Sequence, residues 1–100
     1  MPKVNATVAN GLGKEKAKEK LDYMVERLGR EYADKVQDLA GEWEDDTLKI
    51  SFKAMGFDIK SNVTVGEEEV DVESQIPLAA LPFKGMVQSK MVSTLEQMLS

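Results

Sequence analysis

The chain of 100 residues contains no cysteine and no histidine. Without cysteine it can form neither a disulfide nor a thiolate metal site, so the fold must depend on packing. Without histidine or cysteine it also lacks the side chains that enzymes use most often as general bases and activated nucleophiles. Its carboxylates lie in predicted turns and on predicted solvent faces, where desolvation shifts a pKa little. We therefore expect a protein that is not an enzyme and that uses no cofactor.

Long apolar runs and clustered positive charge are missing as well. The segment that begins Met1-Pro2-Lys3 lacks the apolar run of a secretory signal, and no stretch approaches the roughly 18 to 20 apolar residues of a membrane span. The formal net charge of −5 argues against a nucleic-acid partner, because phosphate binding depends on clustered cations. With 42% hydrophobic and 31% charged residues, the composition is typical of a globular protein. We expect one cytoplasmic domain spanning residues 1–100.

The first third of the chain predicts one strand and one helix. In residues 3–10, Val4, Ala6 and Val8 recur at the strand period, and the turn residues that follow end this strand. From Lys14 to about Lys35 the apolar residues recur three and four positions apart, which predicts a helix with one apolar stripe. The stripe consists of Ala17, Leu21, Met24, Val25, Leu28 and Tyr32.

Between Val36 and Ile76 the period of two returns, with breaks at Asp45-Asp46, Met55-Gly56 and Gly66-Glu67-Glu68. This pattern predicts four short strands in an antiparallel meander with one apolar face, which must be covered by helices. A second helix is predicted from about Pro82, since proline suits a first helical turn. The expected fold is α+β with the order β-α-β-β-β-β-α, an antiparallel open sheet with two helices packed on one face.

Three charged or glycine-containing stretches resemble sites, and each has a simpler interpretation. The segment Gly11-Leu12-Gly13-Lys14 lacks the spacing and the hydroxyl residue of a phosphate loop, so we interpret it as a turn. The lysines of residues 14–20 alternate with acidic residues and spread around the helix, which favours a solvated face over a contact with an acidic surface. The acidic runs in residues 42–46 and 67–73 lack the ligand spacing of a calcium loop, so no metal site is predicted.

The last helix carries Met86, Met91 and Met98 beside Phe83 and Val87. Flexible thioethers suit either the filling of a core or an adaptable apolar binding surface, and we favour the core. Two helices on a small sheet need not hide every apolar side chain, however, and Trp43, Phe57 and Tyr23 are candidates for partial exposure. A leftover patch would mark a partner or a lipid-like ligand. The candidate surface residues are Phe83, Met86, Met91, Met98 and Trp43.

Three stretches of the chain carry a family resemblance. They are Leu12-Gly13 followed by Ala17 and Leu21, the region of Phe52 and residues 56–65, and Ile76 to Leu99 with Pro82-Phe83-Lys84-Gly85 leading into an amphipathic helix. In these the chain resembles the putative polyhydroxyalkanoic acid system proteins, small bacterial domains associated with storage-granule gene regions.

This chain departs from the family pattern at one place, and the residues that match the pattern also have structural explanations. Members of that family commonly have a histidine near the Leu-Gly pair, where this chain carries Asn10. The matching residues also have structural interpretations, in which Gly13 permits a turn, Gly85 lets a helix approach the sheet and Phe83 fills the core.

The resemblance implies a non-catalytic accessory protein of polyhydroxyalkanoate storage. It would act at a granule surface or on a protein of that system through the exposed part of its helical layer. The alternative is a small carrier of an apolar ligand, enclosed between the helices and the sheet. Homodimerisation through an open sheet edge, either the first strand or the Val70–Ile76 strand, is compatible with both hypotheses.

Overall fold

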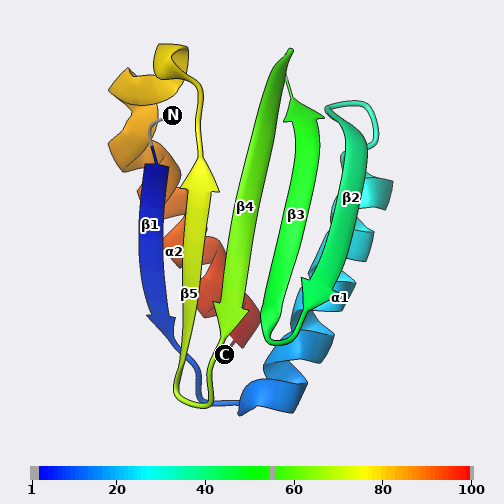
Figure 1. Cartoon of the computed structure of the whole chain (residues 1–100), viewed down its shortest axis with the longest axis vertical. Coiled ribbons are helices and arrows are strands. Elements are labelled where there is room, and N and C mark those ends of the chain that lie inside the picture. Colours follow the sequence, from blue (N-terminus) through cyan, green and yellow to red (C-terminus); the bar gives the residue numbers. More distant parts are fainter. Residues whose placement is uncertain (1–2, 55, 100) are drawn as a thin grey trace.

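A computed structural model describes residues 3–54 and 56–99 and has two layers, a five-stranded sheet and two helices behind it (Figure 1). All strand pairs are antiparallel, and the strand order across the sheet is β1-β5-β4-β3-β2. The predicted fold class and element order are confirmed. The elements are β1 Lys3–Ala9, α1 Lys14–Glu31, β2 Val36–Glu44, β3 Thr47–Ala54, β4 Phe57–Val65, β5 Glu69–Gln75, the 3₁₀ helix η1 Leu78–Phe83 and α2 Lys84–Leu99.

The position of β1 decides which strands are edges. Strands β2 to β5 form the predicted meander, and β1 then pairs with β5 along its whole length, from Lys3 opposite Gln75 to Ala9 opposite Glu69. The Val70–Ile76 strand therefore lies inside the sheet with a partner on each side. Its prediction as an open edge is wrong, because β1 satisfies the hydrogen-bonding groups that a terminal meander strand would expose.

Both real edges carry features that limit strand addition. On β1, the carbonyl oxygen of Asn5 accepts a hydrogen bond of 2.6 Å from Nε2 of Gln88 on α2. On β2, the register with β3 shifts between Gln37 and Ala40, and Asp38 within this bulge has a φ of 54°. Bulges twist an edge away from incoming strands, and side chains on an edge compete with them.

The core lies between the sheet and the helices. Alternate residues of every strand face the helical layer, and their apolar side chains pack against Ala17 and Leu21 of α1 and Leu95 and Leu99 of α2. The opposite face of the sheet has no helix over it and carries polar residues such as Lys49, Asn62 and Asp71. The one-sided alternation in the sequence thus reflects a sheet that is covered on one side only.

Helix ends differ from the prediction by a few residues. Helix α1 ends at Glu31 instead of near Lys35, because the N–H groups of Lys35 and Val36 both bond to the carbonyl oxygen of Tyr32 and so close a turn into β2. Helix α2 begins at Lys84, and Pro82 lies in the preceding 3₁₀ helix. Of the predicted Met55-Gly56 turn, Met55 lies outside the described residues, while Gly56 has a φ of 82° that suits glycine.

Two expectations for the segment before α2 are wrong. Phe83 does not fill the core, since 55% of its surface is exposed. Gly85 does not mark a close approach to the sheet, because no atom lies within 4 Å of the place where a Cβ would stand. The chain leaves the sheet at the end of β5 and passes through η1 before α2 returns over the core, so this segment projects from the layer. Gly13, with a φ of 84°, does permit the turn between β1 and α1.

Replacement of Leu21 tests how far the fold depends on the contact between α1 and the sheet. Leu21 is completely buried, so Leu21→Ala should lower the free energy of unfolding by about 2 to 5 kcal/mol. The measurement is urea unfolding followed by circular dichroism. The matched control on the same helix is Tyr23→Ala, at a side chain that is 56% exposed, where the change should stay within about 0.5 kcal/mol. Equal effects of the two substitutions would contradict the assignment of Leu21 to the core.

Candidate functional site

The two helices cover the two sides of the sheet and leave its middle less covered. Figure 1 shows that α1 lies behind β2 and α2 behind β1 and β5, and that the helices come together near the C-terminus and diverge toward the opposite end of the sheet. Contacts of α2 are most numerous with β1, while α1 and α2 touch each other only sparsely. Leu48, Val63 and Val65 on the inner face of β3 and β4 are buried, whereas Phe52 and Ser61, between the diverging helices, are only partly covered.

Polar contacts hold α1 to the hairpin between β2 and β3. The Nζ atoms of Lys18 and Lys14 lie 2.7 Å and 2.9 Å from the carboxylate oxygens of Asp46. Further along, Nε1 of Trp43 donates a hydrogen bond of 2.8 Å to the carboxylate of Asp22, and Nζ of Lys18 lies 5.2 Å from the centre of the Trp43 ring. These contacts fix α1 over β2 and so define one wall of the gap between the helices.

The gap is an apolar groove of about 580 Å³. We call it the interhelical groove; its floor is formed by the inner face of β3, β4 and β5, and its walls by the facing sides of α1 and α2. Its lining is almost entirely apolar. The apolar residues that line it are Met24, Leu28, Ile50, Phe52, Val63, Val72, Met86, Val87, Met91 and Leu95. The volume lies within the range of roughly 300 to 1,000 Å³ that small-molecule sites occupy.

The floor of the groove contains one polar pair. The Oγ atoms of Ser61 on β4 and Ser74 on β5 face each other across the strand pair at 2.7 Å, and Ser74 is buried. Each hydroxyl has one proton, so the mutual hydrogen bond uses one and leaves the other for a further acceptor. Within the described residues, neither hydroxyl makes another hydrogen bond. The pair therefore offers a donor in otherwise apolar surroundings.

The side chain of Lys90 brings a positive charge to the side of the groove. Lys90 on α2 lines the interhelical groove and also the adjoining furrow of about 490 Å³ between the two helices, where Lys20 and Arg27 of α1 lie. Arg27 is paired with Glu31 at 3.0 Å. Neither Lys20 nor Lys90 forms an ion pair with any carboxylate in the described part of the chain. This side of a protein with a net charge of −5 thus carries two unpaired positive charges.

A second apolar surface lies beside the groove, on η1 and the first residues of α2. The chain from Ile76 to Phe83 contains no charged residue, and its large side chains project outward from η1. We call Leu78, Leu81, Phe83 and Met86 the η1 patch. Leu78 is 73% exposed and Met86 65% exposed, and Met86 also lines the groove. These four large apolar residues lie within nine positions of the sequence and are all exposed, and exposed apolar residues in such numbers are typical of surfaces that bind a partner.

The residues predicted as one surface fall in three places. Phe83 and Met86 belong to the η1 patch, Met91 lines the interhelical groove, and Met98 lines the adjoining furrow and packs partly on the core. Trp43 lies on β2, half-buried beneath α1, so the structure does not bring it together with the methionines. Sequence reasoning missed Ser61, Ser74 and Lys90. The signal was present in the two serines, which interrupt the apolar alternation of neighbouring strands.

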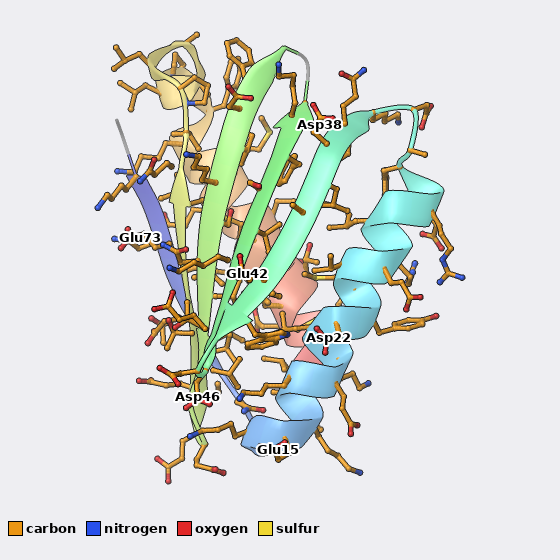
Figure 2. The ribbon with its side chains drawn as sticks, turned by 45° about the vertical axis from the view of Figure 1, so that its right-hand side comes forward. Glu15, Asp22, Asp38, Glu42, Asp46 and Glu73 are labelled. Atoms are coloured by element: carbon orange, nitrogen blue, oxygen red, sulfur yellow. The ribbon has the colours of Figure 1, made fainter. Side chains whose placement is uncertain are left out.

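The charged stretches resolve into separate contacts. Figure 2 shows Asp38, Glu42, Asp46 and Glu73 at different places around the sheet, so these carboxylates do not converge. Among residues 3–54 and 56–99, no three carboxylates form a group that could hold a metal ion. Of the lysines in residues 14–20, Lys14 and Lys18 both form ion pairs with Asp46 of the hairpin. Lys18 also donates a hydrogen bond to the carbonyl oxygen of Asp45. Their role is structural and not the solvated face that the sequence suggested for the whole cluster.

Comparison with known proteins places the chain in a family. A family model described as putative polyhydroxyalkanoic acid system protein matches residues 5–99. The chain belongs to this family. Comparisons with curated proteins and with solved structures find no match. Within the described residues, no helix combines the length and the apolar character needed to cross a membrane.

The side chain of Asn10 connects the loop after β1 to the rest of the fold. Its buried side chain donates to the carbonyl oxygens of Gly13 and Gly66 and accepts a hydrogen bond of 3.0 Å from the N–H of Leu12. These bonds join the β1–α1 loop to the β4–β5 turn. All of them stay within the fold, so Asn10 has a structural role in this loop.

The Asp46 contacts predict a pH dependence of stability. Hydrogen bonds from Lys18 and Lys14 lower the pKa of Asp46 below its ordinary value of 3.8, and the contact with Asp46 raises the pKa of Lys14 above 10.5. A carboxylate with a lowered pKa stabilises the fold above its unfolded-state pKa and loses this contribution as the pH falls through its folded-state pKa. Asp46→Asn should therefore be less stable than the wild type at neutral pH, and the difference should shrink in acid.

The measurement is thermal unfolding at a series of pH values from neutral down to below the ordinary pKa of Asp46. The matched control is Asp45→Asn, since Asp45 makes no ion pair in the described region and its φ of 55° is accessible to asparagine. A difference between Asp46→Asn and the wild type that stays constant into acid would contradict the assigned role of the carboxylate.

Proposed function

We propose that this protein is a non-catalytic accessory protein of polyhydroxyalkanoate storage that acts in the cytoplasm and docks on the granule through the η1 patch. The observation that carries this proposal is the exposure of Leu78, Leu81, Phe83 and Met86 on one projecting segment. Membership of the family supplies the storage system. A polyester of hydroxyalkanoic acids presents alkyl groups at its surface, so exposed apolar side chains are the complementary chemistry.

The patch has the composition of a docking surface. Its residues lie within an uncharged stretch of eight residues, 76–83, and the start of α2, in a chain in which 31% of residues are charged. Removal of these side chains from water would contribute roughly 25 cal/mol for each Å² of apolar surface buried. Such a contact does not depend on charge, so salt should not weaken it. The remainder of the surface is acidic overall, which favours solubility of the unbound protein.

Co-sedimentation with isolated polyhydroxyalkanoate granules across a salt series tests the proposal. Wild-type protein should pellet with granules at low and at high salt, and Leu78→Glu and Phe83→Glu should each reduce the bound fraction, because a buried unpaired carboxylate is costly. Both sites are exposed, so circular dichroism should show an unchanged fold. Tyr23→Glu, at an exposed aromatic outside the patch, is the matched control and should bind as the wild type does.

Two outcomes would contradict granule docking. One is wild-type protein that stays in the supernatant at every salt concentration. The other is binding that is lost equally in Tyr23→Glu, or that disappears on a rise in salt, since either result would show that the η1 patch is not the contact. Size-exclusion chromatography of the same variants identifies the case in which the patch instead joins two copies of the chain, because Phe83→Glu would then convert a dimer into a monomer.

A further inference from the structure

We infer that the interhelical groove binds a single medium-chain hydroxyalkanoate anion, with its alkyl chain on the groove floor, its carboxylate at Lys90 and its hydroxyl at the Ser61–Ser74 pair. This site adjoins the granule-docking surface and shares only Met86 of the η1 patch with it. The groove and its charge stand on the geometry alone, whereas the choice of a hydroxyalkanoate over other oxygen-bearing acids rests on the proposed function. The ligand is a free monocarboxylic acid, one unit of the polymer chemistry and not the polymer itself.

The alkyl chain follows from the lining and the dimensions of the groove. The walls and floor are almost entirely apolar over about 580 Å³. This volume lies within the range of small-molecule sites, so the groove can hold a medium-chain acyl group.

The carboxylate follows from charge complementarity. Lys90 lines the groove and forms no ion pair within the described residues, and Lys20, also unpaired there, lies in the adjoining furrow. Two of the carboxylates on α1 are engaged by other side chains, since Asp22 is bound to Trp43, and Glu31, which lines the furrow, is bound to Arg27. A ligand with one negative charge would complete the pairing, while its chain would occupy the apolar part of the groove. The arrangement thus favours an anionic amphiphile over a neutral hydrocarbon.

The hydroxyl follows from the serine pair. The mutual bond of 2.7 Å between Ser61 and Ser74 leaves one hydroxyl proton without an acceptor among the described residues, and the pair lies in the otherwise apolar lining of the groove. A chain bearing a hydroxyl oxygen can accept it, whereas an unsubstituted chain leaves it without a partner. Valine or alanine at these positions would continue the apolar pattern of both strands. The serines therefore give the groove a preference among chains of the same length.

Titration calorimetry of the purified full-length protein with defined acids tests the site without granules. Decanoate should bind, and it should bind on the order of a hundredfold more tightly than hexanoate, because four further methylene groups are removed from water. β-Hydroxydecanoate should bind about threefold to tenfold more tightly than decanoate, the range expected for one additional hydrogen bond. Decanol should bind more weakly than decanoate. Absence of detectable decanoate binding at millimolar concentration would overturn the inference.

Variants separate the two polar contacts. Lys90→Gln should weaken decanoate by about threefold to fivefold and leave decanol unchanged, as expected for loss of one exposed charge pair. Its matched control is Lys60→Gln on the opposite face of the sheet, which should bind as the wild type does. The double variant Ser61→Ala/Ser74→Ala removes both hydroxyls together and so leaves no unpaired partner. It should abolish the advantage of β-hydroxydecanoate over decanoate while decanoate binding is kept.

The outcomes distinguish this inference from granule docking. Decanoate binding that is unchanged in Lys90→Gln, or a hydroxyl preference that persists in the double serine variant, would overturn the assigned orientation. Leu78→Glu and Phe83→Glu, which do not line the groove, should still bind β-hydroxydecanoate. A protein that binds the acid but no granules refutes the docking proposal and leaves the groove assignment intact, and a protein that binds granules but no acid does the reverse.

Discussion

The architecture is governed by the need to cover one apolar face of a wide sheet with two helices. Five strands at about 4.8 Å spacing make a layer about 19 Å wide, and two helices packed side by side at 8 to 10 Å could just cover it. Here the helices are held at opposite sides. Lys14, Lys18 and Trp43 attach α1 to the β2–β3 side, and Gln88 attaches α2 to β1. The interhelical groove is the part of the sheet that this arrangement cannot cover.

The same constraint explains the division of the molecule into a tightly packed end and an open end. Where the helices approach each other, Leu21, Leu95 and Leu99 complete the core over Leu48, Val63 and Val65. Toward the other end of the sheet the helices diverge, and partly buried Met24, Phe52 and Met91 line an opening instead of filling it. Methionine suits such walls, since its flexible side chain adapts to irregular surroundings. The packed core and the proposed ligand site thus lie toward different ends of one layer.

The sequence was informative wherever one local rule decides the structure. Alternation in Leu48, Ile50 and Phe52 and the spacing of Ala17 and Leu21 gave the strands, the helices and the face on which they meet. It could not give the position of β1, because a strand joined by a helix can pair at either side of a meander. The sequence also wrongly predicted Phe83 in the core, because an apolar residue at helical spacing indicates a core position unless the path of the preceding chain is known. The groove depends on the angle between two helices, which no local pattern encodes.

Net charge does not prevent the groove from attracting an anion. The excess of acidic residues lies on the polar face of the sheet and on hairpin tips, as Glu42, Glu73 and Asp46 show (Figure 2). At physiological ionic strength a charge is screened over about 8 Å, so an anion in the groove experiences mainly the charges beside it. Those are Lys90 in the groove wall and, in the adjoining furrow, Lys20 and the ion pair of Arg27 with Glu31. Met86 belongs both to this groove and to the η1 patch, so the proposed acid site and the proposed docking surface adjoin.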